Sequence, residues 1–129
     1  MKRFLIILFV VLVIAGCSNT QLSQQSSASS QNPHRIEITS SGFSPSFVII
    51  KSGDTVIFTN KDSAEHWPAS AAHPTHLVYP DAGGCLGSKF DACHGLTQGE
   101  SWTFAFIHKG TWKYHDHLNP KNFGSITVE

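Results

Sequence analysis

Short segments of alternating polar and apolar residues recur along most of the chain, separated by glycine, proline or aspartate. This period of two predicts β-strands, because successive strand side chains point to opposite faces of a sheet. No segment after residue 16 shows a sustained helical period. The predicted fold class is therefore all-β, an antiparallel β-sandwich or barrel. We expect strands at residues 35–39, 46–50, 55–60, 101–107, 110–117 and 124–128.

The N-terminal segment has a different pattern. Residues 1–3 are Met-Lys-Arg, and the apolar run that follows, residues 4–14, is shorter than the about 20 residues that span a bilayer. This predicts an export signal over residues 1–16. The run closes with Ile-Ala-Gly before Cys17, which resembles the lipobox of bacterial lipoproteins and implies acylation of that cysteine. An ordinary signal peptide that happens to contain a cysteine is the alternative.

We therefore expect an exported protein, lipid-anchored to the outer face of the cytoplasmic membrane or held in the periplasm or cell envelope. Residues 17–33 are mostly Ser, Gln, Asn and Ala without charge, which predicts a flexible tether because such a segment cannot bury a core. Residues 34–129 then form a single small domain.

Composition and motifs exclude several functions. Nine basic and nine acidic residues give a formal net charge of zero, so there is no electrostatic case for nucleic acid as a partner. The chain has no Ser-His-Asp set, no paired catalytic carboxylates and no nucleotide-binding loop. We do not predict an enzyme, although a copper-dependent oxidation of a small molecule stays open.

Two histidines, His115 and His117, flank Asp116 in a predicted strand. On a strand the two imidazoles project to one face, close enough to share a metal ion, and the carboxylate projects to the other face. Imidazole ligands favour copper or zinc, and Cu(II) heads the affinity order of divalent metals. Asp116 could ligate, accept an imidazole N–H, or be an ordinary hydrogen-bonded residue. The alternative for the histidines is an exposed pair on a sandwich face.

The region from residue 66 to 99 is long for a loop in a compact domain, and such loops are usually functional. It contributes three further candidate ligands, His66, His73 and His76, although His66 could instead simply pack. Pro74 stiffens the segment between the last two.

The same loop contains Cys85 and Cys93, the only cysteines apart from Cys17. Disulfides form and persist outside the cytoplasm, so an exported chain with this pair predicts a disulfide. The bond would order the histidine-bearing loop.

The order of strand, Gly-Asp turn, strand ending in Asn60, loop histidine and Gly-x-aromatic-x-aromatic segment resembles the cupredoxin family, over about residues 34–128. The resemblance implies a Greek-key sandwich that binds copper. It also implies that His66, which follows Asn60 at the family's spacing, is a copper ligand. Asp116 stands where the family has its ligand cysteine, so a blue copper centre, which needs a thiolate, is not expected.

Residues 110–117 are also similar to the Gly-Thr-x-x-Tyr-His-Ser-His segment in the first domain of multicopper oxidases, where paired histidines bind copper at a domain interface. The accompanying His-Trp-His segment of that family is broken here, because Pro68 follows His66 and Trp67. A complete trinuclear oxidase centre cannot form within this one chain.

The leading hypothesis is a membrane-anchored copper-binding protein outside the cytoplasm that captures, buffers or delivers copper to an acceptor protein. One ion, preferably Cu(II) with zinc as the other candidate, would be held by His66, His115 and His117 with help from His73 and His76. The alternatives are electron transfer with a redox partner and a metal-free structural or interaction module.

Overall fold

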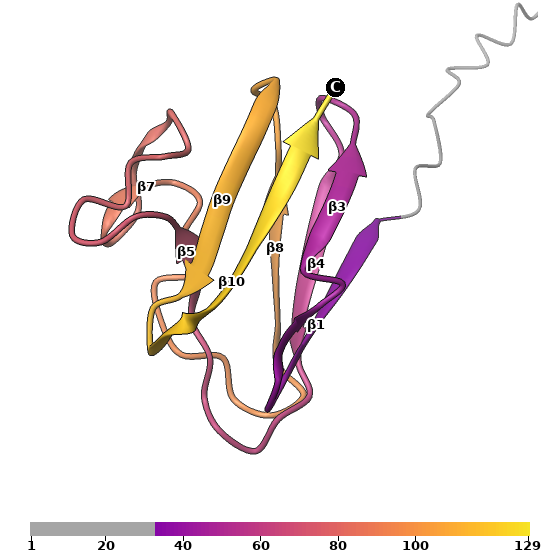
Figure 1. The fold of residues 1–129 in the computed structure, drawn as a ribbon, viewed down its shortest axis with the longest axis vertical. Coiled ribbons are helices and arrows are strands. Elements are labelled where there is room, and N and C mark those ends of the chain that lie inside the picture. Colours follow the sequence, from indigo (N-terminus) through magenta and orange to yellow (C-terminus); the bar gives the residue numbers. More distant parts are fainter. Residues whose placement is uncertain (1–32) are drawn as a thin grey trace, which may run out of the picture.

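The computed structural model describes residues 33–129; the expected export signal, Cys17 and most of the tether lie outside the described residues. Residues 33–129 contain no helix, and so no helix long and apolar enough to cross a membrane occurs among them. Ten strands form two four-stranded sheets and a small hairpin. The two larger sheets face each other across the core (Figure 1).

The first sheet has the order β2-β1-β4-β8 and the second has the order β3-β10-β9-β5. The strands of the first sheet are β1 (His34–Thr39), β2 (Gly42–Ser44), β4 (Thr55–Asn60) and β8 (Ser101–Ala105). Those of the second are β3 (Phe47–Ile50), β5 (Pro68–Ser70), β9 (Gly110–Asp116) and β10 (Asn119–Val128). The hairpin pairs β6 (Ala82–Gly83) with β7 (Gly87–Ser88).

The predicted all-β sandwich is confirmed, but the sheets are mixed and not purely antiparallel. Strands β1 and β4 pair in parallel, and so do β3 and β10. The prediction also missed β2, β5, β6 and β7, because two or three residues are too few to show an alternating pattern. These strands are defined by their pairing: β2 with β1, β5 with β9, and β6 with β7.

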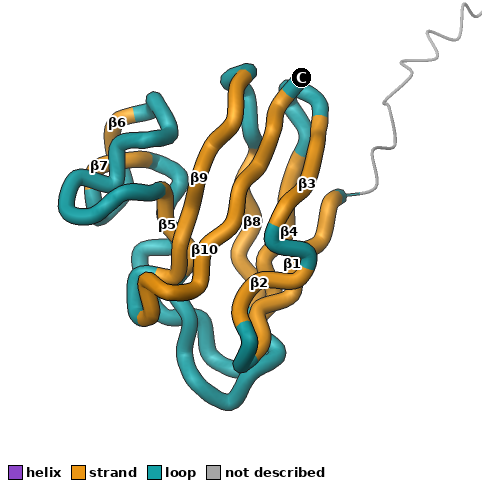
Figure 2. The backbone as a smooth tube through the Cα atoms, viewed as in Figure 1, coloured by secondary structure: helices purple, strands orange, loops and turns teal. Residues whose placement is uncertain are grey.

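Alternating side chains of the predicted strands fill the core. In β4 every second residue is buried, and the ring of Phe58 packs edge-on against Tyr114 of β9 with ring centroids 5.4 Å apart. The long loop also contributes to the core, since Tyr79 and Phe90 are fully buried and their ring centroids lie 6.0 Å apart. These two rings fix the loop between β5 and β8, which extends from the sandwich next to β5 (Figure 2).

Candidate metal centre

The alternation predicted for β9 is present. Tyr114 and Asp116 are fully buried and face the aromatic core between the sheets. His115 points the other way, because its cross-strand partner Phe123 is 72% exposed and cross-strand partners share a face. His115 and His117 therefore start the site on the outer face of the second sheet.

The loop after β5 brings two more histidines to this face. The ring centroid of His73 lies 4.6 Å from that of His115, and the ring centroid of His76 lies 5.0 Å from that of His117. One ring nitrogen from each of the four side chains can be chosen so that all four atoms lie within 4.8 Å of one another. These four residues are called the histidine cluster below.

Backbone hydrogen bonds fold this loop over β9. The Ala71 N–H donates to the Lys113 carbonyl of β9 at 2.9 Å. The Val78 N–H then closes the loop on the Ala71 carbonyl at 2.9 Å, and the His76 N–H donates to the Ala72 carbonyl at 2.8 Å. His115 of the cluster thus comes from β9, His117 from the turn directly after it, and the other two histidines from a loop hydrogen-bonded to that strand.

The ring of His76 is oriented by the backbone of Ser70. His76 Nδ1 lies 2.9 Å from the Ser70 carbonyl, which can only accept, so Nδ1 carries the proton and donates. The lone pair is therefore on Nε2. A carbonyl that holds the second nitrogen of an imidazole in this way is the usual support of a metal-binding histidine.

Two ring nitrogens of the cluster are buried without a hydrogen-bond partner among the described residues, His115 Nε2 and His117 Nδ1. Leaving a polar atom buried and unpaired costs about 1–3 kcal/mol. A metal ion would satisfy both lone pairs, and a set of four imidazoles suits copper and zinc.

The cluster is also electrostatically suited to a cation. Burial, reinforced by repulsion from the other three histidines, lowers the pKa of His115 from 6.5 to about 4. Burial is likewise the main cause that lowers the pKa of His117. These imidazoles are neutral at neutral pH, and metal coordination requires the neutral form.

The structure places His66 apart from the cluster. Its Nδ1 donates to Asp116 Oδ2 at 2.7 Å and its Nε2 donates to Asp62 Oδ2 at 3.1 Å. Burial alone would lower the pKa of His66, but the hydrogen bonds to the two carboxylates outweigh it and raise the pKa above the usual value. Both ring nitrogens of His66 carry protons in this arrangement, so neither presents a lone pair to a metal ion.

Asp116 does not join the cluster either, because it lies on the opposite face of β9 from His115. Its second oxygen, Oδ1, accepts the backbone N–H of Trp67 at 2.9 Å and of Leu118 at 3.1 Å. Of the three roles considered for Asp116, the structure shows the hydrogen-bonded one, with the imidazole N–H of His66 as one donor.

The predicted disulfide between Cys85 and Cys93 is present. The loop that it closes contains Asp91, whose Oδ1 accepts the indole N–H of Trp67 at 2.7 Å. The ring of Trp67 in turn packs against His117 with centroids 4.8 Å apart. Asp91 therefore connects the disulfide loop to the wall of the cluster, a role with no signal in the sequence because the residues are far apart in the chain.

No protein-family model matches the chain, and no curated protein matches it. Solved structures do. A Cu(I) form of an amicyanin mutant is 20% identical, covering 75% of this chain and 82% of that chain with a TM-score of 0.59. The purple cupredoxin from Nitrosopumilus maritimus is 24% identical, covering 74% of this chain and 99% of that chain with a TM-score of 0.60. The chain therefore has a cupredoxin-like fold.

The interior position expected from the cupredoxin resemblance does not fit a blue copper centre. The carboxylate of Asp116 replaces the thiolate and is hydrogen-bonded to His66. Cys85 and Cys93 are bonded to each other, and residues 33–129 contain no methionine. The donor set that does fit copper lies on the other face of β9, in the histidine cluster.

Proposed function

We propose that this protein binds one copper ion, preferentially Cu(II), through the histidine cluster His73, His76, His115 and His117. The observation that carries the proposal is the convergence of four imidazole nitrogens within 4.8 Å of one another, two of which are buried and unpaired. Cu(II) binds such ligands more tightly than zinc does, and the cupredoxin-like fold supports the choice of copper. Zinc is the competing metal.

The protein holds the ligand side chains in place before the copper ion binds. His115 lies in a strand paired on both sides, His117 is in the turn directly after that strand, and the Ser70 carbonyl holds the tautomer of His76. His73 is the exposed member of the set, so the ion would enter and leave at this residue. Imidazole ligation without a thiolate stabilises the Cu(II) state, which suits a protein that holds and passes on the ion.

We further propose that the protein captures or buffers copper outside the cytoplasm and delivers it to an acceptor protein, while an acylated Cys17 anchors it to the membrane. Support for the anchor comes from the lipobox-like sequence and from the disulfide, a bond characteristic of oxidising compartments. Mass spectrometry of the protein from a bacterial membrane fraction tests it, since an unmodified N-terminus at any residue other than Cys17 contradicts the anchor.

The copper proposal is tested by loading the full-length protein with Cu(II), removing excess metal by desalting and measuring retained copper. We expect one equivalent, an electron paramagnetic resonance spectrum with nitrogen hyperfine structure and only weak visible absorption. His66→Asn should retain the equivalent. Retention of less than one equivalent by the wild type, or its loss in His66→Asn but not in His115→Asn, contradicts the assignment.

Electron transfer is the second candidate, and the observation in its favour is the cupredoxin-like fold. Electron transfer requires a site with similar affinity for Cu(I) and Cu(II). Four imidazoles without a thiolate instead favour Cu(II). Voltammetry of the loaded protein separates the two functions: fast reversible exchange supports electron transfer, and slow irreversible waves support copper handling.

A further inference from the structure

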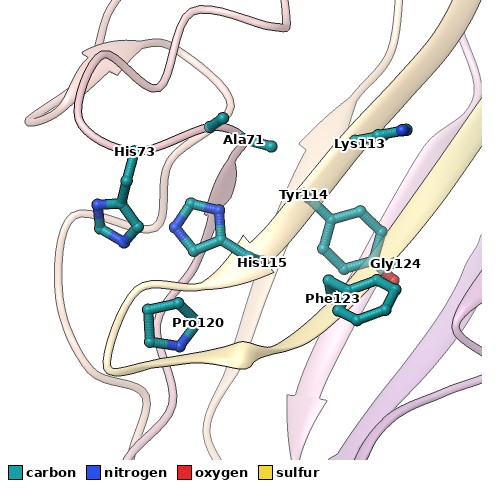
Figure 3. A pocket seen from close by; sticks show the side chains of 9 residues that line it. Ala71, His73, Lys113, Tyr114, His115, Pro120, Phe123 and Gly124 are labelled. Atoms are coloured by element: carbon teal, nitrogen blue, oxygen red, sulfur yellow. The ribbon is translucent and has the colours of Figure 1, made fainter.

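The outer face of the second sheet carries a groove beside the histidine cluster. It consists of two adjoining hollows, of about 290 Å³ and about 240 Å³. The side chains of Lys113 and Phe123 and the backbone of Gly124 line both hollows, so they form one continuous feature. His73 and His115 line one end of it (Figure 3).

The walls of the groove are mostly apolar. Ala71, Ala72 and Pro120 line the hollow beside the cluster, and Phe47 lines the other. Phe123 is 72% exposed and Phe47 is 55% exposed, although rings of this size gain most by leaving water. Concave apolar walls with a few polar groups are typical of small-molecule sites.

One charged side chain, Lys113, lines the groove. The ammonium of Lys113 makes no ion pair within residues 33–129, and no carboxylate lines either hollow. Lys113 lies at one side of the hollow and Pro120 at the other (Figure 3). The fully buried Tyr114 faces the core between the sheets, so its hydroxyl is not open to the groove. The groove thus offers one positive charge inside apolar walls.

We propose that this groove binds a small organic carboxylate, with its apolar body between Phe123, Phe47 and Pro120 and its carboxylate at Lys113. Charge complementarity selects an anion, because Lys113 is the one fully charged side chain of the lining. The apolar walls exclude small hydrated anions such as acetate or phosphate, which would gain nothing from them. The size of the hollows selects a small molecule.

The groove and the histidine cluster share His73 and His115. If the proposed copper site is correct, on which this step alone rests, the bound carboxylate and the Cu(II) ion occupy adjoining sites, and their opposite charges attract. Each ligand then raises the affinity of the protein for the other by the same factor. The groove would make copper retention responsive to an organic acid.

The groove is tested first on the metal-free full-length protein by equilibrium dialysis against 3-phenylpropionate, with 3-phenylpropanamide as the neutral analogue. We expect one saturable site that prefers the carboxylate by about two- to fivefold, as for an ion pair with an exposed ammonium. Lys113→Met should reduce the affinity for the carboxylate to that for the amide, and Phe123→Ala should weaken both. Lys109→Met, which removes an exposed lysine outside the groove, should change neither.

Three results overturn the proposal: no saturable binding of 3-phenylpropionate, equal affinity for carboxylate and amide, or affinities that neither Lys113→Met nor Phe123→Ala changes. A concentration-dependent dimer in sedimentation experiments that Phe123→Ala dissociates also overturns it, because the groove is then an interface between copies. Binding to the metal-free protein does not involve copper. A protein that binds 3-phenylpropionate but retains no copper therefore refutes the proposed function and leaves the groove in place.

Discussion

The eight histidines of this chain fall into two groups of four that differ in their partners. In the first group each imidazole pairs with at least one carboxylate, at distances between 2.7 and 3.2 Å: His34 with Asp54, His66 with Asp62 and Asp116, His94 with Glu100, and His108 with Asp81. In the second group, the histidine cluster, no imidazole pairs with a carboxylate of residues 33–129, and the rings face one another.

Two members of each group show opposite electrostatics. Hydrogen bonding to Glu100 raises the pKa of His94, and the pKa of His66 is raised as well, so these imidazoles favour the protonated state. Burial lowers the pKa values of His115 and His117, so these favour the neutral state. A protonated imidazole donates hydrogen bonds and a neutral one can ligate a metal. The presence or absence of a carboxylate therefore separates structural histidines from candidate ligands.

Removing two ligands should have the largest effect. His115→Asn with His117→Asn is expected to weaken Cu(II) binding by more than about 100-fold, since even partners outside the ligand set contribute 10–100-fold. Competition against a chelator of known affinity measures this. The matched control, His94→Asn with His108→Asn, removes two carboxylate-paired imidazoles and should leave the affinity unchanged. Equal losses in both double variants would remove the distinction between the groups.

The pH dependence of stability should differ in sign between His115 and His66. Because the pKa of His115 is about 4 in the folded protein and 6.5 when unfolded, the unfolded chain binds more protons between these values. The metal-free protein should therefore lose stability as pH falls from about 6.5 to 4, by at most about 3 kcal/mol from this residue. Denaturant unfolding at several pH values measures the loss, and His115→Asn should flatten it.

The carboxylate-paired His66 acts in the opposite direction. Its pKa is raised on folding, so its contribution is complete below pH 6.5 and is lost as pH rises through the folded value. His66→Asn should remove that alkaline loss and leave the acid loss intact. If stability falls equally between pH 6.5 and 4 in the wild type and in His115→Asn, the lowered pKa of His115 is contradicted.

Asp116→Asn should affect stability more than copper binding. The substitution weakens the buried contact with His66 Nδ1 and is expected to lower the free energy of unfolding by about 1.5–3 kcal/mol, as for a hydrogen bond between charged groups. The copper stoichiometry should remain one, because Asp116 faces away from the cluster. Thermal unfolding and metal analysis of the same sample measure both. Loss of copper with unchanged stability would identify Asp116 as a ligand.

The smallest effect is expected at the surface. His94 and Glu100 form an exposed pair, and such pairs contribute little because water and salt screen them. His94→Asn should change stability slightly at low ionic strength and not at all at high ionic strength, with no change in copper affinity. Unfolding curves at two salt concentrations measure this, and a salt-independent loss would show that His94 has another role.

Much of the architecture follows from local pattern. The alternation along the chain predicted the main strands and the all-β sandwich, and the cysteine pair in an exported chain predicted the disulfide; all three are present. The parallel pairings of β1 with β4 and of β3 with β10 were not predicted, because alternation specifies which face a side chain occupies and not which strand lies beside it.

At the site, the sequence by itself determined that His115 and Asp116 lie on opposite faces of a strand, although that strand ends at Asp116 and His117 is in the turn after it. Only the tertiary structure decided which loop histidines meet them. His66 turns inward to Asp116, whereas His73 and His76 reach the outer face. The physical reason is that strand geometry is local and repeats every two residues, whereas the path of a loop depends on partners far away in the sequence, such as the Lys113 carbonyl.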